Sequence, residues 1–326
     1  MGDAYSDRLI ADGTYDNDMQ KVIDAIFTIE PFESLKELFN IYVVYVVSEN
    51  EVIGKSTALA TYDVRSGYGA IGSADSWRYE VYARKASSKF DFRDVTPIIV
   101  LNSSVSDGAV WTTLLHAQDD YLNDPNWDDY HGGESVAYVS GPNSADFDYT
   151  VRHECGHALG QLADEYITYD QEIDSYLKQQ LQWGMNYGQW KNIDFTSDGD
   201  VVKWKSFIID CRYSYSGIGV YEGGAQYTTG VWRPTENSIM NNDANGQYNA
   251  PSREAIYYRL NKIAYGDSWQ YDYETFVQQD LKNLSTGTMS SFNKVPYPAR
   301  INHKHLFKLE EFTTPNGKKK ITAIMN

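Results

Sequence analysis

Residues 153–160 carry the sequence HECGHALG, in which two histidines stand four positions apart with a glutamate between them. On a helix, positions i and i+4 lie on one face about 6 Å apart, so His153 and His157 can bind one zinc ion together. Glu154 then lies beside the metal, where it can take a proton from the attacking water and deliver it to the leaving amine. Chance would produce this pattern on the order of 0.005 times in a chain with six histidines. The stretch therefore predicts a zinc hydrolase, although a helix face whose His and Glu only satisfy core hydrogen bonds is the alternative.

A third metal ligand is expected shortly after this helix, because catalytic zinc sites usually have three protein ligands. On an unbroken helix Asp164 would lie about 16 Å further along the axis than His153, which is out of reach. We expect Gly160 to end the helix in the left-handed conformation and to turn the chain back toward the metal. Asp164 is then the predicted third ligand, and Glu165 is the alternative.

The composition excludes several classes of protein. The 326 residues include 45 Asp and Glu against 28 Lys and Arg, and this net charge of -17 argues against nucleic acid or an anionic membrane as a partner. No run of about 18 apolar residues occurs, so no integral membrane segment is expected. Two cysteines cannot build a disulfide framework or a Cys-based metal cluster. A Cys155–Cys211 disulfide and a buried free thiol at Cys155 both stay open.

Location and assembly are predicted only from composition. No signal peptide is visible in roughly the first thirty residues. Many Tyr, Trp, Asn, Gly and Ser with few Lys and Cys are typical of a bacterial exported protein. We therefore expect a secreted, periplasmic or cell-surface protein, and a monomer.

Hydrophobic periodicity predicts an α/β (α+β) fold with a mixed sheet. We expect a metallopeptidase domain over residues 1–285, followed by a basic β-like tail or further module over residues 286–326, with a hairpin around Pro315–Gly317. The predicted helices are Asn17–Phe27, Glu33–Leu38, Phe147–Gly160, one opened by Pro251, and Tyr273–Leu281. The predicted strands are Ile41–Val47, Tyr79–Tyr82, Thr96–Leu101, Glu134–Ser140 and Val201–Ile209, the last preceded by a hairpin signal at Asp198–Asp200.

The sequence around the two histidines of residues 153–160 resembles known families. His153 to Gly160 resembles the zinc signature of the metzincins, whose helix breaks at that glycine, but the metzincin pattern places its third ligand where Ala163 stands here. The longer string from His153 to Tyr166 is more similar to the bacterial immunoglobulin A metallopeptidase family. The resemblance covers roughly residues 2–265 and includes four further segments: Gly2–Tyr5, Pro31-Phe32 with Phe39-Asn40, Tyr221–Gly224, and Arg233–Met240.

This resemblance implies a metzincin-like zinc endopeptidase that cuts internal peptide bonds of extracellular proteins, with immunoglobulin-like or glycoprotein substrates as candidates. It implies a mixed twisted sheet, a zinc-binding helix, a Met turn and a C-terminal helix. Met240 would form the turn beneath the ligands, where its thioether packs as a soft floor rather than as a ligand. One more core methionine is the alternative.

Several features leave alternatives open. The strand Glu134–Ser140 is either a cleft edge that pairs with an extended peptide or an ordinary edge strand. The acidic loops Asp119–Asp129 and Asp194–Asp200 do not follow a calcium-binding spacing, and we expect solvated loops. The remaining histidines are expected to be bystanders: His116, His131, His303 and His305. The candidates for stabilising the oxyanion are Tyr166, Tyr227, Arg233 and Tyr248.

Two other functions compete with the endopeptidase. One is a non-catalytic module that binds glycan or protein on the same scaffold, which predicts no zinc-dependent turnover. The other is a zinc exopeptidase or cell-wall amidase, which predicts cleavage only at chain ends or in peptidoglycan fragments. An open cleft in the metzincin-like architecture favours the endopeptidase.

Overall fold

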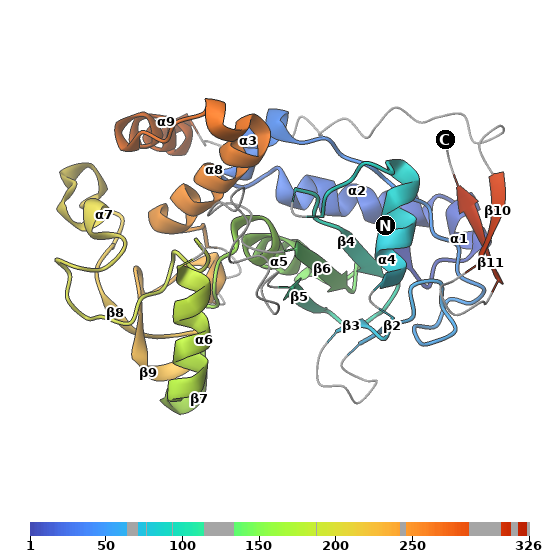
Figure 1. The fold of residues 1–326 in the computed structure, drawn as a ribbon, viewed down its shortest axis with the longest axis horizontal. Coiled ribbons are helices and arrows are strands. Elements are labelled where there is room, and N and C mark those ends of the chain that lie inside the picture. The colour runs from blue at the N-terminus through green and yellow to red at the C-terminus, as the bar shows by residue number, and fades with distance from the viewer. Residues whose placement is uncertain are drawn as a thin grey trace.

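The computed structural model describes residues 1–63, 71–75, 77–92, 94–113, 134–186, 188–241, 246–286, 308–313 and 319–324 (Figure 1). Its α-helices are α1 (Asp7–Ala11), α2 (Thr14–Ile26), α3 (Phe32–Leu35), α4 (Trp77–Ala86), α5 (Phe147–Gly160), α6 (Ser175–Met185), α7 (Lys205–Ile209), α8 (Ala250–Tyr265) and α9 (Tyr273–Thr286). Its strands are β1 (Gly2–Asp3), β2 (Thr61–Tyr62), β3 (Gly72–Ser73), β4 (Ile98–Leu101), β5 (Asp107–Thr113), β6 (Glu134–Ser140), β7 (Ile167–Glu172), β8 (Tyr221–Gly224), β9 (Gln226–Arg233), β10 (Lys308–Thr313) and β11 (Lys319–Ile324). Short 3-10 helices include η1 (Lys36–Leu38), η4 (Cys211–Tyr213), η5 (Ile239–Asn241) and η6 (Gly266–Ser268). In the described ranges no helix has the length and apolar character needed to cross a membrane.

The central sheet has the strand order β1-β4-β6-β5. β1, β4 and β6 are parallel, and β5 runs antiparallel to β6. Alternate residues of β4 and β6 enter different hydrophobic clusters, with Val100 and Val139 on the side of α2 and α5, and Ile99 and Tyr138 on the side of α4. The sheet is therefore covered by helices on both faces, which fits the continuous apolar run in β4. This mixed α/β arrangement agrees with the predicted class.

A second layer of structure lies on the other side of α5 (Figure 1). It contains a three-stranded sheet in the order β7-β9-β8, in which β7 and β9 are parallel and β8 is antiparallel. A small core under this sheet includes Ala163, Ile173, Ile193 and Val231, and Leu177 and Leu181 of α6 pack against it. Helix α5 contacts β5 and β6 of the central sheet, and Ala163, which follows α5, belongs to the core of the three-stranded sheet. The C-terminal end of α5 therefore lies between the two sheets.

The long periodic elements are confirmed. The predicted helices correspond to α2, to α3 with η1, and to α5, α8 and α9, and two predicted strands correspond to β4 and β6. Helix α8 begins after Asn249, whose side chain accepts a hydrogen bond from Ser252 N, with Pro251 in the first turn. In the tail, β10 and β11 pair antiparallel from Lys308↔Ile324 to Thr313↔Lys319, as the turn signal predicts, and residues 314–318 lie outside the described ones.

Three predicted strands are wrong. Ile41–Val47 is not in a sheet, because its polar groups are used elsewhere; Val44 O accepts from Tyr15 Oη at 2.6 Å. Tyr79–Tyr82 lies inside α4, where Tyr79, Tyr82 and Ala83 share the buried helical face. Strand propensity describes residues that suit a half-buried pleated surface, and the same side chains also fit a buried helix face.

The third error is Val201–Ile209, which forms turns and the short helix α7. Asp198 O accepts from Val201 N at 2.9 Å and from Val202 N at 3.0 Å, so the hairpin signal produces a turn without a hairpin. The carboxylate of Asp198 accepts from Asp200 N at 2.9 Å, which ties this acidic loop together. The other acidic loop, 119–129, lies outside the described residues.

Strand β6 is not the edge strand that the sequence predicts. It lies between β4 and β5, so β5 is the edge strand of the described sheet. The sequence did not predict β5 at all. Its residues Asp107–Thr113 mix Gly, Ala and Thr with two large apolar side chains and show no clear alternation.

A buried carboxylate explains the family-like opening at Gly2–Tyr5. Asp3 is fully buried, and its carboxylate accepts five hydrogen bonds. The donors are Ser48 Oγ at 3.0 Å, Thr57 Oγ1 at 2.6 Å, Leu59 N at 3.0 Å, Thr61 N at 3.1 Å and Thr61 Oγ1 at 2.6 Å. Asp3 therefore holds the irregular segment 48–61 against the start of the central sheet.

We expect Asp3→Ala to lower the free energy of unfolding by about 3 kcal/mol or more, because several buried donors lose their acceptor at once. Urea denaturation measures the effect. The matched control is Glu49→Ala, which removes an exposed carboxylate nearby and should change stability by less than about 0.5 kcal/mol. Equal midpoints for the two variants would contradict the role given to Asp3.

Candidate metal and catalytic site

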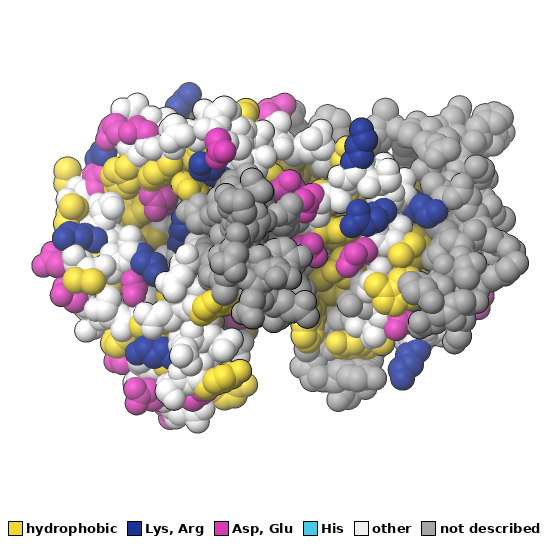
Figure 2. Space-filling model, in the orientation of Figure 1, with side chains coloured by type: hydrophobic (Ala, Val, Ile, Leu, Met, Phe, Trp, Pro, Cys, Tyr) yellow, Lys and Arg dark blue, Asp and Glu magenta, His cyan; other side chains and the backbone are white. Residues whose placement is uncertain are grey.

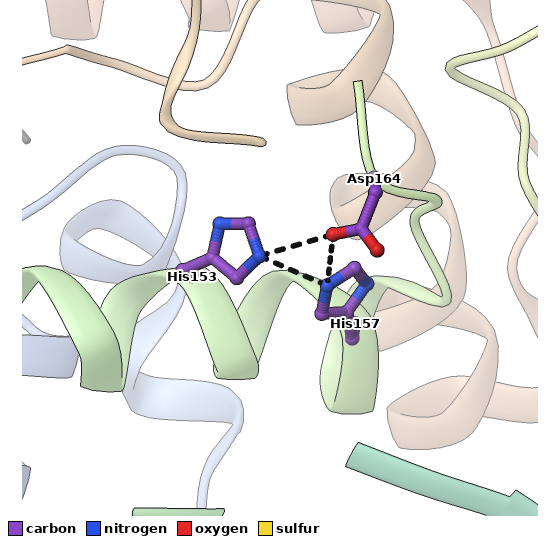
Figure 3. Close-up of side chains that lie close together, drawn as sticks. All are labelled: His153, His157 and Asp164. Atoms are coloured by element: carbon purple, nitrogen blue, oxygen red, sulfur yellow. Dashed lines mark hydrogen bonds and ion pairs between the residues drawn. The ribbon is translucent and has the colours of Figure 1, made fainter. Parts of the chain in front are cut away.

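Helix α5 brings the predicted ligands together (Figure 3). His153 Nε2 lies 3.1 Å from His157 Nε2, and both nitrogens approach Asp164 Oδ1, at 3.2 Å and 3.0 Å. Within the part of the chain that the structure describes, these three residues form the one group of His, Cys, Asp or Glu with ligand atoms close enough to share a metal ion.

The turn that returns Asp164 to the helix differs in detail from the prediction. Helix α5 does end at Gly160, but the left-handed residue is Gln161, with φ 51° and ψ 40°. Gly160 is required for a different reason, because a Cβ there would lie 2.6 Å from Ile256 Cγ1 of α8. The absence of a side chain at Gly160 thus allows α8 to pack closely, and Gln161 makes the turn.

Backbone carbonyls orient both imidazoles. His153 Nδ1 lies 2.9 Å from Ile239 O, and His157 Nδ1 lies 2.7 Å from Leu162 O. Because a carbonyl can only accept, each Nδ1 carries the proton and donates it, and each Nε2 lone pair points toward the centre of the group. The carboxylate of Asp164 is held in turn by Gln226, whose Nε2 donates to Oδ2 at 3.1 Å. Such supporting hydrogen bonds are typical around metal ligands.

This donor set fits zinc. Two imidazole nitrogens and one carboxylate oxygen converge, which is a common set in catalytic zinc sites that keep a fourth position for water or substrate. Burial and the two imidazoles act in opposite directions on Asp164, and the imidazoles hold the pKa of its carboxyl well below the usual range. Burial lowers the pKa of His157, but Asp164 raises it more, to about 9. Without a metal the group therefore favours an additional proton on His157 beside Asp164, and a metal ion would take the place of that positive charge.

Glu154 lies beside this group without joining it. Its side chain is only 6% exposed, and Oε2 has no hydrogen-bond partner among the described residues. Burial raises the pKa of Glu154, and the nearby imidazoles partly offset this effect. A buried carboxylate oxygen without a donor is costly, so the free oxygen indicates a place where a water or substrate group belongs.

Strand β5 approaches Glu154 from the opposite side, and sequence reasoning missed its role. A Cβ at Gly108 would lie 2.6 Å from Glu154 Oε1, so only glycine lets the strand backbone come this close. A glycine inside a strand often marks such a close approach, so Gly108 is the sequence feature that could have indicated this role of β5.

Glu165, the alternative ligand, does not join the two histidines, because its carboxylate is held by other residues. It is fully buried, and its carboxylate accepts from Ser238 Oγ at 2.6 Å, Asn192 Nδ2 at 2.9 Å and Asn249 Nδ2 at 2.9 Å. Adjacent acidic residues thus point in different directions. Asp164 faces the histidines, and Glu165 ties three segments together beneath them.

Met240 lies in η5 beneath α5. It is fully buried, and a Cβ at Gly156 would lie 2.6 Å from its Sδ, so the thioether packs directly against the helix between the two histidines. The same turn supplies the carbonyl of Ile239 that holds His153, and Met240 O accepts from Glu165 N at 2.8 Å.

Comparison with known protein families gives one match. The sequence profile of the family described as IgA Peptidase M64 matches residues 1–214, which include His153, Glu154, His157 and Asp164. The chain belongs to the IgA peptidase M64 family. It is therefore a peptidase, and M64 peptidases are metallopeptidases, so the His/His/Asp group is its possible metal site. No curated protein matches the chain.

The site of this M64 peptidase opens into a cleft of about 600 Å³. One wall is formed by β5 and α5, and the other by α6, β7, β9 and the turn at Gln189-Trp190. Figure 2 shows the surface notched between the part of the molecule that carries α6 and the part that carries the central sheet. His153, His157 and Asp164 are among the residues that line this cleft.

The candidates for stabilising the oxyanion separate clearly. Tyr166 and Tyr227 line the cleft, and the Tyr166 ring lies 6.0 Å from the His153 ring, centre to centre. Tyr248 is fully buried, and its hydroxyl donates to Arg152 O. Arg233 donates to Glu222 O, Gly223 O and Thr235 O. Neither Tyr248 nor Arg233 is among the residues that line the cleft, so Tyr166 and Tyr227 are the better placed candidates.

The other sequence candidates take no part in the site as described. Cys155 is buried and Cys211 is exposed, and both are free thiols, so no disulfide joins them. The histidines at 116, 131, 303 and 305 lie outside the described residues.

Proposed function

We propose that this M64 peptidase is a zinc-dependent endopeptidase, in which His153, His157 and Asp164 hold the metal and Glu154 transfers the proton. The observation that carries the proposal is the convergence of three ligand atoms within 3.2 Å of one another, next to a buried carboxylate oxygen without a partner. A zinc ion bound there would supply Lewis acidity that polarises the peptide carbonyl and lowers the pKa of the attacking water.

The remaining chemistry belongs to the chain's own residues. Glu154 Oε2 accepts a proton from the attacking water and then donates it to the leaving amine. Its raised pKa, caused by burial, suits a group that must take up and release a proton near neutral pH. Of the hydroxyl side chains that line the cleft, which also include Thr112 and Tyr169, we assign Tyr166 and Tyr227 to stabilising the negative charge on the carbonyl oxygen.

An extended substrate would lie along β5. This strand is the edge of the described central sheet, and Gly108, Ala109, Val110 and Thr112 line the cleft. A peptide can pair with such an edge by main-chain hydrogen bonds and pass on in both directions, which supports internal rather than terminal cleavage. In the metzincin-like layout that we propose, the turn with Met240 would be the Met turn and α8 the C-terminal helix.

The substrate and its location are part of the proposal. We propose that the enzyme is a bacterial protein acting as a monomer outside the cytoplasm on extracellular proteins, with immunoglobulin-like or glycoprotein substrates as candidates. The net charge of -17 gives nucleic acid no electrostatic attraction.

A proteome-derived peptide library, digested with and without a zinc chelator, tests this function. We expect internal cleavages that disappear with chelator and return with added zinc. Cleavage only at chain ends, or only of peptidoglycan fragments, would replace the endopeptidase by an exopeptidase or amidase. Binding of peptides or glycans without any cleavage would favour a non-catalytic module.

A further inference from the structure

Unusual backbone conformations gather around the cleft. Six non-glycine residues in the described chain have positive φ, and four of them line the cleft. These four are Gln161 at 51°, Trp190 at 51°, Ala225 at 48° and Gln226 at 72°. Residues of this kind persist only where the surrounding structure holds them, and they concentrate at binding sites. Gln226 holds the carboxylate of Asp164, whereas Gln161 and Trp190 serve none of the roles described so far.

Gln161 and Trp190 are coupled directly. Trp190 N donates to Gln161 O at 2.8 Å, so the two left-handed residues fix each other. A Cβ at Gly184 would lie 2.1 Å from Trp190 Cζ3, which means that this glycine lets the indole lie against α6. The two side chains are therefore held on the cleft wall by backbone features.

The side-chain amide of Gln161 has an unused hydrogen-bond donor. The residue is 5% exposed, and its Nε2 has no hydrogen-bond partner in the described chain. A buried donor without an acceptor is unfavourable, and an acceptor supplied by a ligand would relieve that cost. Gln161 lines the same cleft as His153, His157 and Asp164, so one bound peptide can contact both this donor and the metal site.

Apart from the buried amide of Gln189, the rest of this part of the cleft is apolar. Leu177 and Leu181 stand one turn apart on α6 and line the cleft together with Trp190. Among the described lining residues there is no Lys or Arg, and the nearby charged groups include the carboxylates of Glu154 and Asp164. An anionic group would therefore find no Lys or Arg to pair with, whereas a neutral acceptor on an apolar stem would suit both the walls and the amide.

We propose that Gln161, Leu177, Leu181 and Trp190 form a specificity subsite for a substrate side chain next to the cleaved bond. The preferred side chain has an apolar stem that ends in a neutral hydrogen-bond acceptor, as in glutamine or tyrosine, and Gln161 Nε2 donates to it. The inference rests on the proposed peptidase function and adds a substrate preference to it. Gln161 acts in recognition and touches no reacting atom.

The peptide library, read out position by position, tests this subsite. At one position flanking the cleaved bond we expect glutamine or tyrosine to exceed leucine and glutamate by about tenfold in kcat/KM. Gln161→Leu should remove the advantage over leucine, and Leu181→Glu should introduce a preference for lysine and arginine. The matched control is Gln182→Leu, on the exposed side of α6, which should leave the profile unchanged.

The results of these experiments distinguish failure of the subsite from failure of the peptidase function. Chelator-sensitive cleavage with the same profile in all three variants overturns the subsite, and a buried water would then be the partner of Gln161. Because Gln161→Leu places a new side chain in a left-handed position, Leu181→Glu gives an independent test on an ordinary helix. Library binding to the Glu154→Gln protein reports the preference even where no bond is cut. A preference in binding without cleavage supports the subsite and contradicts the peptidase mechanism, and binding without any preference overturns the subsite.

Discussion

Replacing Glu154 by glutamine should lower kcat for peptide hydrolysis by about 10²–10⁴-fold, while the protein keeps its fold and one zinc per chain. Glutamine has nearly the same shape but cannot accept the proton of the attacking water. Because Glu154 does not belong to the ligand group, its replacement should leave metal binding intact. Steady-state kinetics, metal analysis and thermal unfolding of the same preparation measure the three quantities.

The control for this prediction is Glu236→Gln, which alters an exposed carboxylate outside the cleft and should leave kcat unchanged. A Glu154→Gln protein that carries one zinc per chain and cuts peptides at the original rate would contradict the proton-transfer role. Loss of zinc from Glu154→Gln would instead indicate that Glu154 is a metal ligand.

The adjacent acidic residues Asp164 and Glu165 should respond in opposite ways. Asp164→Asn should weaken zinc binding by at least about 100-fold and abolish activity at stoichiometric zinc, because the site loses its charged ligand. Glu165→Gln should keep one zinc per chain but unfold at a lower temperature, because the buried network through Ser238, Asn192 and Asn249 loses its carboxylate.

Zinc titration by calorimetry and thermal unfolding distinguish these two variants. The pair serves as its own control, since each change removes one charge from neighbouring residues. Loss of zinc in Glu165→Gln with full binding in Asp164→Asn would exchange their roles and contradict the geometry of the turn after α5.

The sequence predicted the helix of the site well because its signals are local. The ends of α5 and the His–Glu–His spacing depend on residues within a few turns, and the structure places His153, His157 and Asp164 together as expected. The direction of Glu165 could not be predicted, because it depends on Asn192, Ser238 and Asn249, which are distant in sequence.

Errors in the fold have the same physical origin. Ile41–Val47 has strong strand propensity, but it joins no described sheet, and Val44 O accepts from the Tyr15 side chain instead. The edge strand β5 opens with Asp, Gly and Ala, which disfavour strands, and these residues are extended because they pair with β6. Likewise, the left-handed turn was expected at a glycine, yet Gly160 serves helix packing and Gln161 turns the chain. Tertiary contacts decide all three features.

Titration of the metal-free enzyme with zinc tests the proposed mechanism most directly. The substrate is an internally quenched peptide chosen from the library digest, and the rate of internal cleavage is recorded after each addition. A single site at His153, His157 and Asp164 predicts no activity without metal and a linear rise that stops at one zinc per chain. Full activity in the metal-free protein, or a rate that does not depend on added zinc, would contradict a zinc-dependent peptidase.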